Sequence, residues 1–117
     1  MRHILAVAVA ALSLPSMIAA QEPPPGDRIV GKRVYLANGC QNCHGTVGQG
    51  GGPGPVLADT GLPYEAYAGQ MRTPQNTMPP YDAALMSDRD LADVYAYLRS
   101  LPGPLDAADM PAILTRR

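Results

Sequence analysis

The sequence predicts a small all-α domain in which helices are joined by long irregular loops. Residues 27–39 and 87–101 carry apolar side chains at helical spacing, and a shorter helix is expected from Pro63 to about Met71. Residues 45–61 are rich in Gly and Pro, which excludes regular structure there, and the prolines of residues 73–81 are expected to keep that stretch extended. At 117 residues the chain has room for one domain of this kind.

Residues 1–20 are predicted to be a secretory signal peptide. A positively charged start precedes a mostly aliphatic stretch at residues 4–14, and small residues lead to an expected cleavage after Ala20, with Ala19 as the alternative. Pro15 interrupts the apolar stretch, which is too short to span a bilayer. No later segment is apolar enough to do so, and we expect the processed protein to lie in the periplasm without a membrane span.

The rest of the chain divides into three parts. Residues 21–26 are expected to form an extended Pro-rich leader, residues 27–104 a folded domain, and residues 105–117 a C-terminal tail. The tail contains an apolar cluster at residues 110–114, which can dock a partner or fold back on its own domain. The sequence leaves both roles open.

The composition excludes some classes of partner. Formal net charge is −1, and removal of Arg2 with the signal peptide makes it −2. Binding to nucleic acid or to a membrane surface would require clustered Lys and Arg, yet only Lys32 and Arg33 adjoin within the domain. The chain has six Tyr but no Phe and no Trp, so the core lacks its usual large apolar side chains. A buried cofactor would supply the missing bulk.

Both long helices have sequence signals at their ends. Asp27 can cap the first helix, and Gly39 can end it. Gly31 lies inside this helix, where Gly costs about 1 kcal/mol relative to Ala, so we expect another backbone to approach closely there. Ser87 and Asp90 form a capping-box pattern at the start of the last helix. The side chains expected to share the apolar side of the first helix are Ile29, Val30, Val34 and Tyr35.

Residues 40–44 read Cys-Gln-Asn-Cys-His, the C-x-x-C-H signature of covalent haem attachment. Two thiols three positions apart reach the two vinyl groups on one edge of the porphyrin. The next residue, His44, can then place its imidazole under the iron as an axial ligand. The sequence therefore predicts one haem c attached through Cys40 and Cys43.

Three other interpretations of the cysteines are weaker. A structural zinc site normally takes four Cys or His ligands, and only two Cys and one His remain once His3 leaves with the signal peptide. A thioredoxin-like redox pair would need alternating strand and helix patterns, which are absent from the sequence. A structural disulfide does not explain the adjoining His44.

A methionine is the expected second axial ligand, because His44 is the one histidine left after processing and a thioether is a known partner of haem iron. Met78 is favoured, since it stands in a Pro-stiffened loop, T-P-Q-N-T-M-P-P-Y, that can present a side chain inward. The other candidates are Met71, expected to pack its helix on the core, Met86, which can staple the last helix, and Met110 in the tail.

With these features the chain resembles a monohaem class I c-type cytochrome of bacteria, from about Asp27 to Leu101. The matching features, in order, are Gly31 and Tyr35, the C-x-x-C-H motif, G-P-V-L at 54–57, Met78 followed by Pro, and Tyr97-Leu98 near the end of the last helix. The resemblance implies N- and C-terminal helices that cross closely, with Gly31 meeting the face around Val94 and Tyr97. A short middle helix and long loops would then surround the haem.

The resemblance also implies roles for residues around the cofactor. The carbonyl of Pro55 would accept a hydrogen bond from the His44 ring nitrogen that is not bound to iron, and Leu57 would pack on the haem face. Gln70, Arg72 or a Tyr would bind the haem propionates. Since Lys32 is the one Lys of the chain, the strongly acidic partners of Lys-ringed mitochondrial cytochromes are not implied.

The predicted function is single-electron transfer outside the cytoplasm, not catalysis, because His/Met ligation leaves no open position at the iron. The expected partners are a periplasmic dehydrogenase as donor and an oxidase or another cytochrome as acceptor. An alternative is an electron-accepting subunit held on a larger periplasmic dehydrogenase, with residues 105–117 as the docking segment. A four-helix haem sensor is disfavoured, since such proteins carry C-x-x-C-H near the C-terminus.

Overall fold

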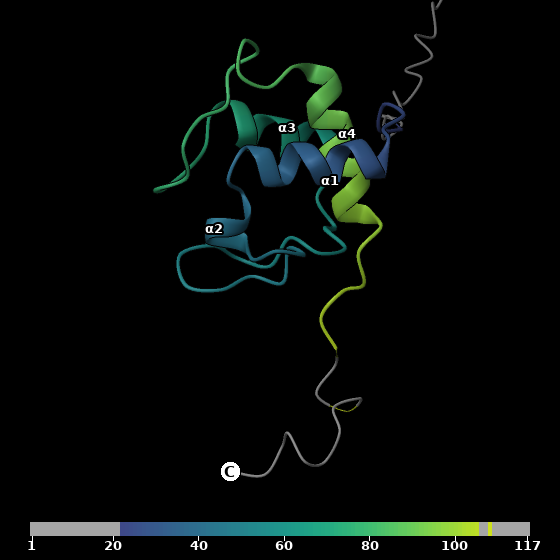
Figure 1. The fold of residues 1–117 in the computed structure, drawn as a ribbon, viewed down its shortest axis with the longest axis vertical. Coiled ribbons are helices and arrows are strands. Elements are labelled where there is room, and N and C mark those ends of the chain that lie inside the picture. The colour runs from purple at the N-terminus through teal and green to yellow at the C-terminus, as the bar shows by residue number, and fades with distance from the viewer. Residues whose placement is uncertain (1–21, 106–107, 109–117) are drawn as a thin grey trace, which may run out of the picture.

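The computed structural model describes residues 22–105 and 108, and it contains four helices in that part of the chain (Figure 1). They are α1 (Arg28–Ala37), α2 (Gln41–His44), α3 (Tyr64–Arg72) and α4 (Asp88–Arg99). The all-α prediction is confirmed, since the described residues form no strand beyond an isolated bridge between Gly51 and Gly54. Across residues 22–105, the helices are too short or too polar to cross a bilayer. The predicted signal peptide and nearly all of the predicted tail lie outside the described residues.

The helix ends follow the predicted signals. The Asp27 carboxylate accepts hydrogen bonds from the backbone N–H groups of Ile29 and Val30, at 2.7 and 3.1 Å. At the start of α4, Ser87 and Asp90 form the complete capping box, with each side chain bound to the other residue's backbone. α3 begins directly after Pro63, as its sequence predicts.

α1 and α4 cross at close quarters, with Gly31 at the crossing (Figure 1). A Cβ atom on Gly31 would overlap the backbone carbonyl of Asp93, so the predicted close approach is confirmed. One turn further along α1, the ring of Tyr35 packs edge-on against Tyr97, with 5.5 Å between ring centroids. The contact fixes the C-terminal end of α1, where the C-x-x-C-H motif begins.

The apolar side of α1 is narrower than predicted. Gly31 and Tyr35 are buried, and Val34 is partly buried, but Ile29 is 58% exposed. Ile29 stands two positions before Gly31, which on a helix of 3.6 residues per turn is nearly the opposite side. Including Ile29 in the buried side was therefore wrong.

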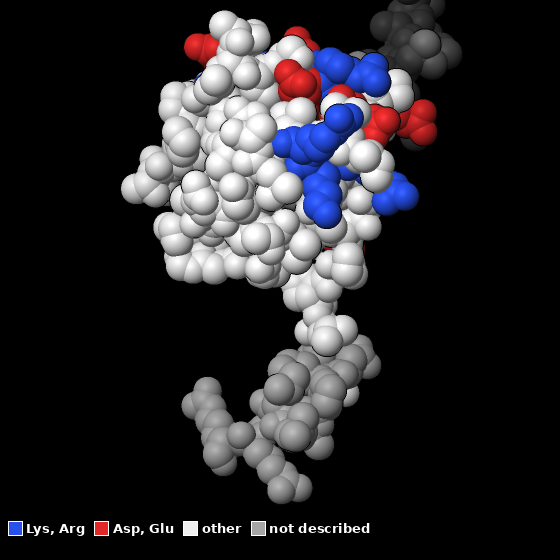
Figure 2. All heavy atoms as spheres, viewed as in Figure 1, with Lys and Arg blue, Asp and Glu red and all other residues white. Residues whose placement is uncertain are grey.

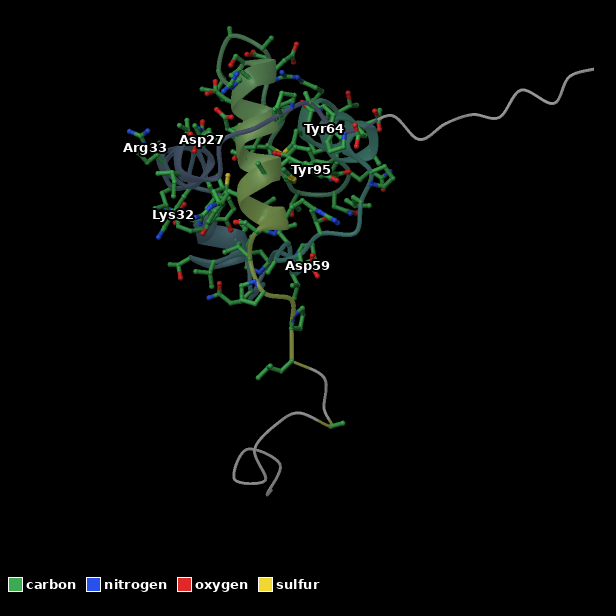
Figure 3. All side chains as sticks on the ribbon, turned by 90° about the vertical axis from the view of Figure 1, so that its right-hand side faces the viewer. Asp27, Lys32, Arg33, Asp59, Tyr64 and Tyr95 are labelled. Carbon is green, nitrogen blue, oxygen red and sulfur yellow. The ribbon has the colours of Figure 1, made fainter. Side chains whose placement is uncertain are left out.

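Tyrosines supply the large rings of the core. Tyr64, Tyr67 and Tyr95 form a cluster between α3 and α4 with ring centroids 5.2–6.0 Å apart, and Figure 3 shows Tyr64 and Tyr95 close together. By contrast, Lys32 and Arg33 point outward from α1 (Figure 3). The core is built on these rings and on the aliphatic side of α4: Leu91, Val94 and Leu98.

Gly31→Ala is expected to destabilise the protein by about 2 kcal/mol, since overpacking at a backbone crossing outweighs the better helix propensity of Ala. The matched control is Gly69→Ala on α3, where an added Cβ meets nothing within 4 Å. This control should be neutral or stabilising by up to about 1 kcal/mol. Urea unfolding of the two holoproteins measures both changes, and equal stability of the two variants would contradict the crossing.

Candidate haem site

A cavity of about 650 Å³ opens between α2, the Gly-rich loop at residues 45–61, α3 and the segment at residues 73–81. Its volume lies within the range of cofactor-binding sites, roughly 300–1,000 Å³. The predicted site residues that line it are Cys40, Cys43, His44, Pro55, Leu57, Gln70 and Met78. Residues from four separate stretches of the chain thus meet in one place.

α2 presents the C-x-x-C-H motif to this cavity as a single helical turn. The backbone N–H of His44 donates to the carbonyl of Cys40 at 3.0 Å, which brings both thiols and the imidazole to the same wall. Cys40 and Cys43 are free thiols, and Cys43 is exposed at the surface while His44 is buried. The sequence analysis did not predict this turn, because four residues are too few to show helical periodicity.

The Gly-rich loop wraps around His44 and orients its ring. The Nδ1 atom of His44 lies 2.9 Å from the carbonyl oxygen of Pro55, and the backbone N–H of Gly50 donates to the His44 carbonyl at 2.8 Å. A carbonyl can only accept, so Nδ1 carries the proton and Nε2 keeps its lone pair for a metal. This is the contact that the Pro55 prediction describes.

Gly54 allows the loop to approach His44 this closely. A Cβ atom at this position would lie 2.6 Å from the Cys43 carbonyl oxygen and 2.8 Å from His44 Nδ1. Any side chain would push the Pro55 carbonyl away from the ring. Gly54 therefore supports the site by packing, a role that its position in a Gly-rich loop did not reveal.

Met78 comes to the cavity from the segment between α3 and α4. Its side chain is partly buried, and the amide nitrogen of Gln70 lies 3.9 Å from its sulfur. Met71 also lines the cavity but is buried in the core, as predicted, and Met86 is fully buried outside the cavity lining. Met110 lies outside the described residues. The arrangement leaves Met78 as the candidate that stands on a loop.

Comparison with known proteins identifies the family. The family described as "Cytochrome C oxidase, cbb3-type, subunit III" matches residues 29–98, which include the whole cavity lining. The chain belongs to this family of c-type cytochromes. It is similar to cytochrome c-555 of Methylococcus capsulatus, with 28% identity over 100 residues that cover 82% of this chain and 81% of that protein. Its fold is similar to that of the c-type cytochrome NirC, with a TM-score of 0.51, 30% identity, and coverage of 64% of this chain and 95% of that one.

The cytochrome therefore carries covalently bound haem c, with iron, and takes part in electron transport. The C-x-x-C-H motif of Cys40, Cys43 and His44 fits this attachment. Within residues 22–105, no three His, Cys, Asp or Glu side chains gather into a metal site of their own.

Tyr67 is a site residue that the sequence analysis did not single out. Its ring lines the cavity, and its hydroxyl is buried without a hydrogen-bond partner among the described residues. Burial holds the pKa of Tyr67 well above its ordinary value, so the hydroxyl stays protonated and can donate. A buried, unpaired donor fits a cofactor that brings acceptor atoms of its own, as haem does with its propionates.

Arg72 lies elsewhere than expected. It does not line the cavity, and its guanidinium donates to the carbonyls of Tyr81 and Met86 and pairs with Asp88. We therefore do not retain Arg72 as a propionate partner. Gln70, which does line the cavity, remains an expected one.

Proposed function

We propose that this cytochrome is a periplasmic single-electron carrier whose haem c is attached at Cys40 and Cys43 and ligated by His44 and Met78. The observation that carries the proposal is the single cavity into which α2 and the segment at residues 73–81 bring these four residues. Removal of residues 1–20 on export, and exchange of electrons with a periplasmic dehydrogenase and an oxidase or another cytochrome, belong to the same proposal.

The protein's own groups tune the site. Haem c supplies a one-electron couple at its iron. The hydrogen bond from His44 Nδ1 to the Pro55 carbonyl fixes the orientation of the imidazole and raises its donor strength. A thioether from Met78 as the second ligand raises the reduction potential. With His44 and Met78 both holding the iron, no position would be left for a substrate, which favours a carrier over an enzyme.

Redox titration of the purified holoprotein tests this function. We expect one reversible step involving one electron, fast oxidation and reduction by small inorganic reagents, and no turnover of oxygen or peroxide. A native ferrous protein that binds carbon monoxide as fast as the Met78→Leu variant does, or a native protein that consumes peroxide, would contradict a ligated carrier.

The two segments that bring Cys40, Cys43, His44 and Met78 to the cavity form an uncharged surface, which bears on the kind of partner. Residues 38–58 and 73–81 contain no Asp, Glu, Lys or Arg, and neither does the lining of the cavity. In Figure 2, charged side chains gather over the helices, while the part of the same face that holds α2 in Figure 1 carries none. We infer that the partners approach through uncharged surfaces.

Rate constants for electron exchange with an anionic and with a cationic inorganic oxidant are expected to depend weakly on ionic strength. Between about 0.01 M and about 1 M salt, screening changes strongly, yet we expect each constant to change by less than about twofold. Stopped-flow measurements at several salt concentrations check this expectation.

A matched pair of variants tests where on the protein surface electrons are exchanged. Val56 is 45% exposed and stands between the lining residues Pro55 and Leu57, whereas Leu85 is 62% exposed and neither it nor its neighbours line the cavity. Val56→Lys should make the reaction with the anionic oxidant faster at low salt, and Leu85→Lys should leave it nearly unchanged. Equal effects of the two lysines would contradict electron exchange at the uncharged surface.

A further inference from the structure

The loop that carries Met78 is closed at its base. Residues 73–80 form no helix and connect the end of α3 to Tyr81. The backbone N–H of Tyr81 donates to the carbonyl of Met71 at 2.9 Å, so the two ends of the loop lie side by side. The Tyr81 hydroxyl donates to the carbonyl of Asn38 at 3.2 Å, which ties the same end to α1. The place of Met78 thus depends on how Tyr81 is held.

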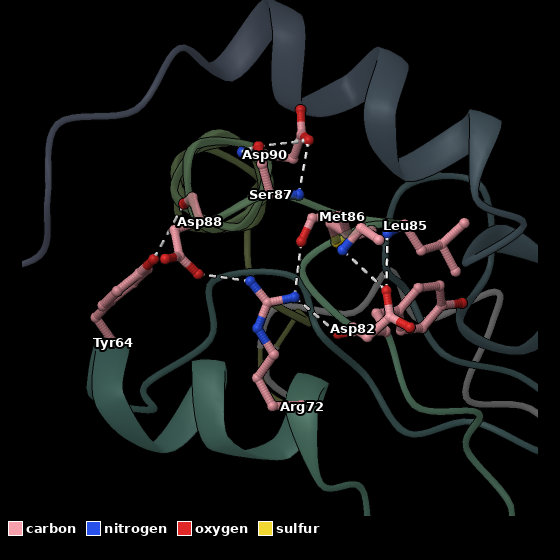
Figure 4. A network of polar contacts seen from close by, with 10 residues as sticks. Tyr64, Arg72, Asp82, Leu85, Met86, Ser87, Asp88 and Asp90 are labelled. Atoms are coloured by element: carbon pink, nitrogen blue, oxygen red, sulfur yellow. Dashed lines mark hydrogen bonds and ion pairs between the residues drawn. The ribbon is translucent and has the colours of Figure 1, made fainter.

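Arg72, the last residue of α3, binds this base through its guanidinium (Figure 4). Its Nη1 atom donates to the carbonyl oxygens of Tyr81 and Met86, each at 2.7 Å. Both residues are buried, and the described part of the chain offers no other donor to either carbonyl. One side chain therefore joins the start of the loop, its end and the approach to α4.

The ion pair that Arg72 makes is the lesser part of this contact. Its Nη2 atom lies 2.5 Å from the Asp88 carboxylate, but the Asp88 side chain is 89% exposed. Ion pairs of such exposed groups contribute little, whereas charge-assisted hydrogen bonds to buried carbonyls are strong. The two carbonyl bonds should therefore carry the effect of Arg72, and Asp88 offers a control that leaves them in place.

We propose that Arg72 is a positioning residue for the Met78 sulfur: by binding the carbonyls of Tyr81 and Met86 it keeps the loop closed over the cavity. This inference rests on the proposed ligation by His44 and Met78. Without the guanidinium, Tyr81 and Met86 lose their shared donor, and the base of the loop, held only by the bonds of Tyr81 to Met71 and Asn38, opens more often. Met78 then spends more time away from the iron, while the covalent attachment at Cys40 and Cys43 is unaffected.

The test uses purified holoproteins: the native chain, Arg72→Leu, Arg72→Lys and the control Asp88→Asn. Two urea midpoints are measured for each: loss of the methionine–iron charge-transfer band of the ferric protein, and loss of helix by far-UV circular dichroism. The rate of carbon monoxide binding to the ferrous protein is a third measurement. One hydrogen bond to a charged donor corresponds to a change of about tenfold or more in a population.

For Arg72→Leu we expect the charge-transfer band to disappear at clearly lower urea than the helices, and carbon monoxide to bind about tenfold faster than to the native protein. Arg72→Lys, which keeps a charged donor but not the guanidinium, should lie between Arg72→Leu and the native chain, and Asp88→Asn should resemble the native chain. If Arg72→Leu fails to fold, the test uses Arg72→Lys. Loss of its charge-transfer band at lower urea than loss of its helices would support the positioning role.

Other outcomes overturn the inference in different ways. If the two midpoints of the Arg72 variants fall together, Arg72 supports only overall stability and the positioning role is refuted. If both midpoints and the carbon monoxide rate match the native values, Arg72 does not hold the loop. If the native protein itself lacks the charge-transfer band, the proposed ligation fails, and this result is separate from any effect of Arg72.

Discussion

The double variant Cys40→Ser, Cys43→Ser is expected to lose covalently bound haem completely. Both thiols line the cavity beside His44, and the chain contains no other cysteine, so no thioether can form without them. Acid-acetone extraction followed by a haem stain on a denaturing gel measures the effect. We expect all the haem of the double variant in the organic phase and that of the native protein on the polypeptide.

Asn42→Ala is the matched control for this experiment. Asn42 lies in the same helical turn, is exposed, and offers no thiol, so its loss should leave the attachment intact. Gel-stable haem in the double variant would refute attachment at Cys40 and Cys43. Loss of haem from Asn42→Ala as well would show that any change in this helical turn prevents attachment, so the loss in the double variant could not be assigned to the thiols.

Local signals in the sequence were enough to place most of the fold. Asp27 and the Ser87–Asp90 capping box mark helix starts because the capping bonds involve residues at most three positions apart. Gly31 indicated a close approach because Gly is unfavourable inside a helix, and the approach is to Asp93. The partner of such a contact is distant in the chain, and only the family resemblance pointed to it.

The part of the site that could be predicted from the sequence is the part formed by one short motif. Cys40, Cys43 and His44 lie within five residues, so their position in one wall of the cavity can be predicted without knowing any contact between distant segments. Gly54 and Tyr67 are different. The first matters through its distance to His44 and the second through a buried hydroxyl without a partner. Both properties exist only once separate segments have packed together.

Arg72 shows that a residue close in sequence to a cavity residue need not face the cavity itself. It stands two residues after Gln70, which lines the cavity, and both looked equally able to reach a propionate. On a helix, however, side chains two positions apart point about 200° apart. Gln70 therefore faces the cavity, and Arg72 faces the start of α4, where it meets Met86 and Asp88. The family resemblance named both residues as candidates, whereas the helix period decides which of the two side chains faces the cavity.

Met78→Leu is expected to remove one ligand of the haem iron and to lower the reduction potential of the haem. Leu has nearly the volume of Met, so the packing of the loop should survive while the thioether is lost. We expect loss of the methionine–iron charge-transfer band, much faster binding of carbon monoxide to the ferrous protein than in the native chain, and a potential lower by on the order of 0.1 V, within the range of about 0.8 V that axial ligands span. Absorption spectra and a redox titration measure all three.

Met71→Leu is the matched control, because Met71 lines the same cavity but is held in the core by α3. This variant should keep the methionine–iron charge-transfer band, the reduction potential and the carbon monoxide binding rate of the native protein. If instead Met71→Leu shows these losses and Met78→Leu does not, the axial ligand is Met71. The Pro-stiffened loop would then only cover the cavity. The role proposed for Arg72 would be refuted as well, because Met78 would not be a ligand that needs positioning. If both variants keep the native spectrum, neither methionine ligates the iron, and a carrier with His/Met ligation is refuted.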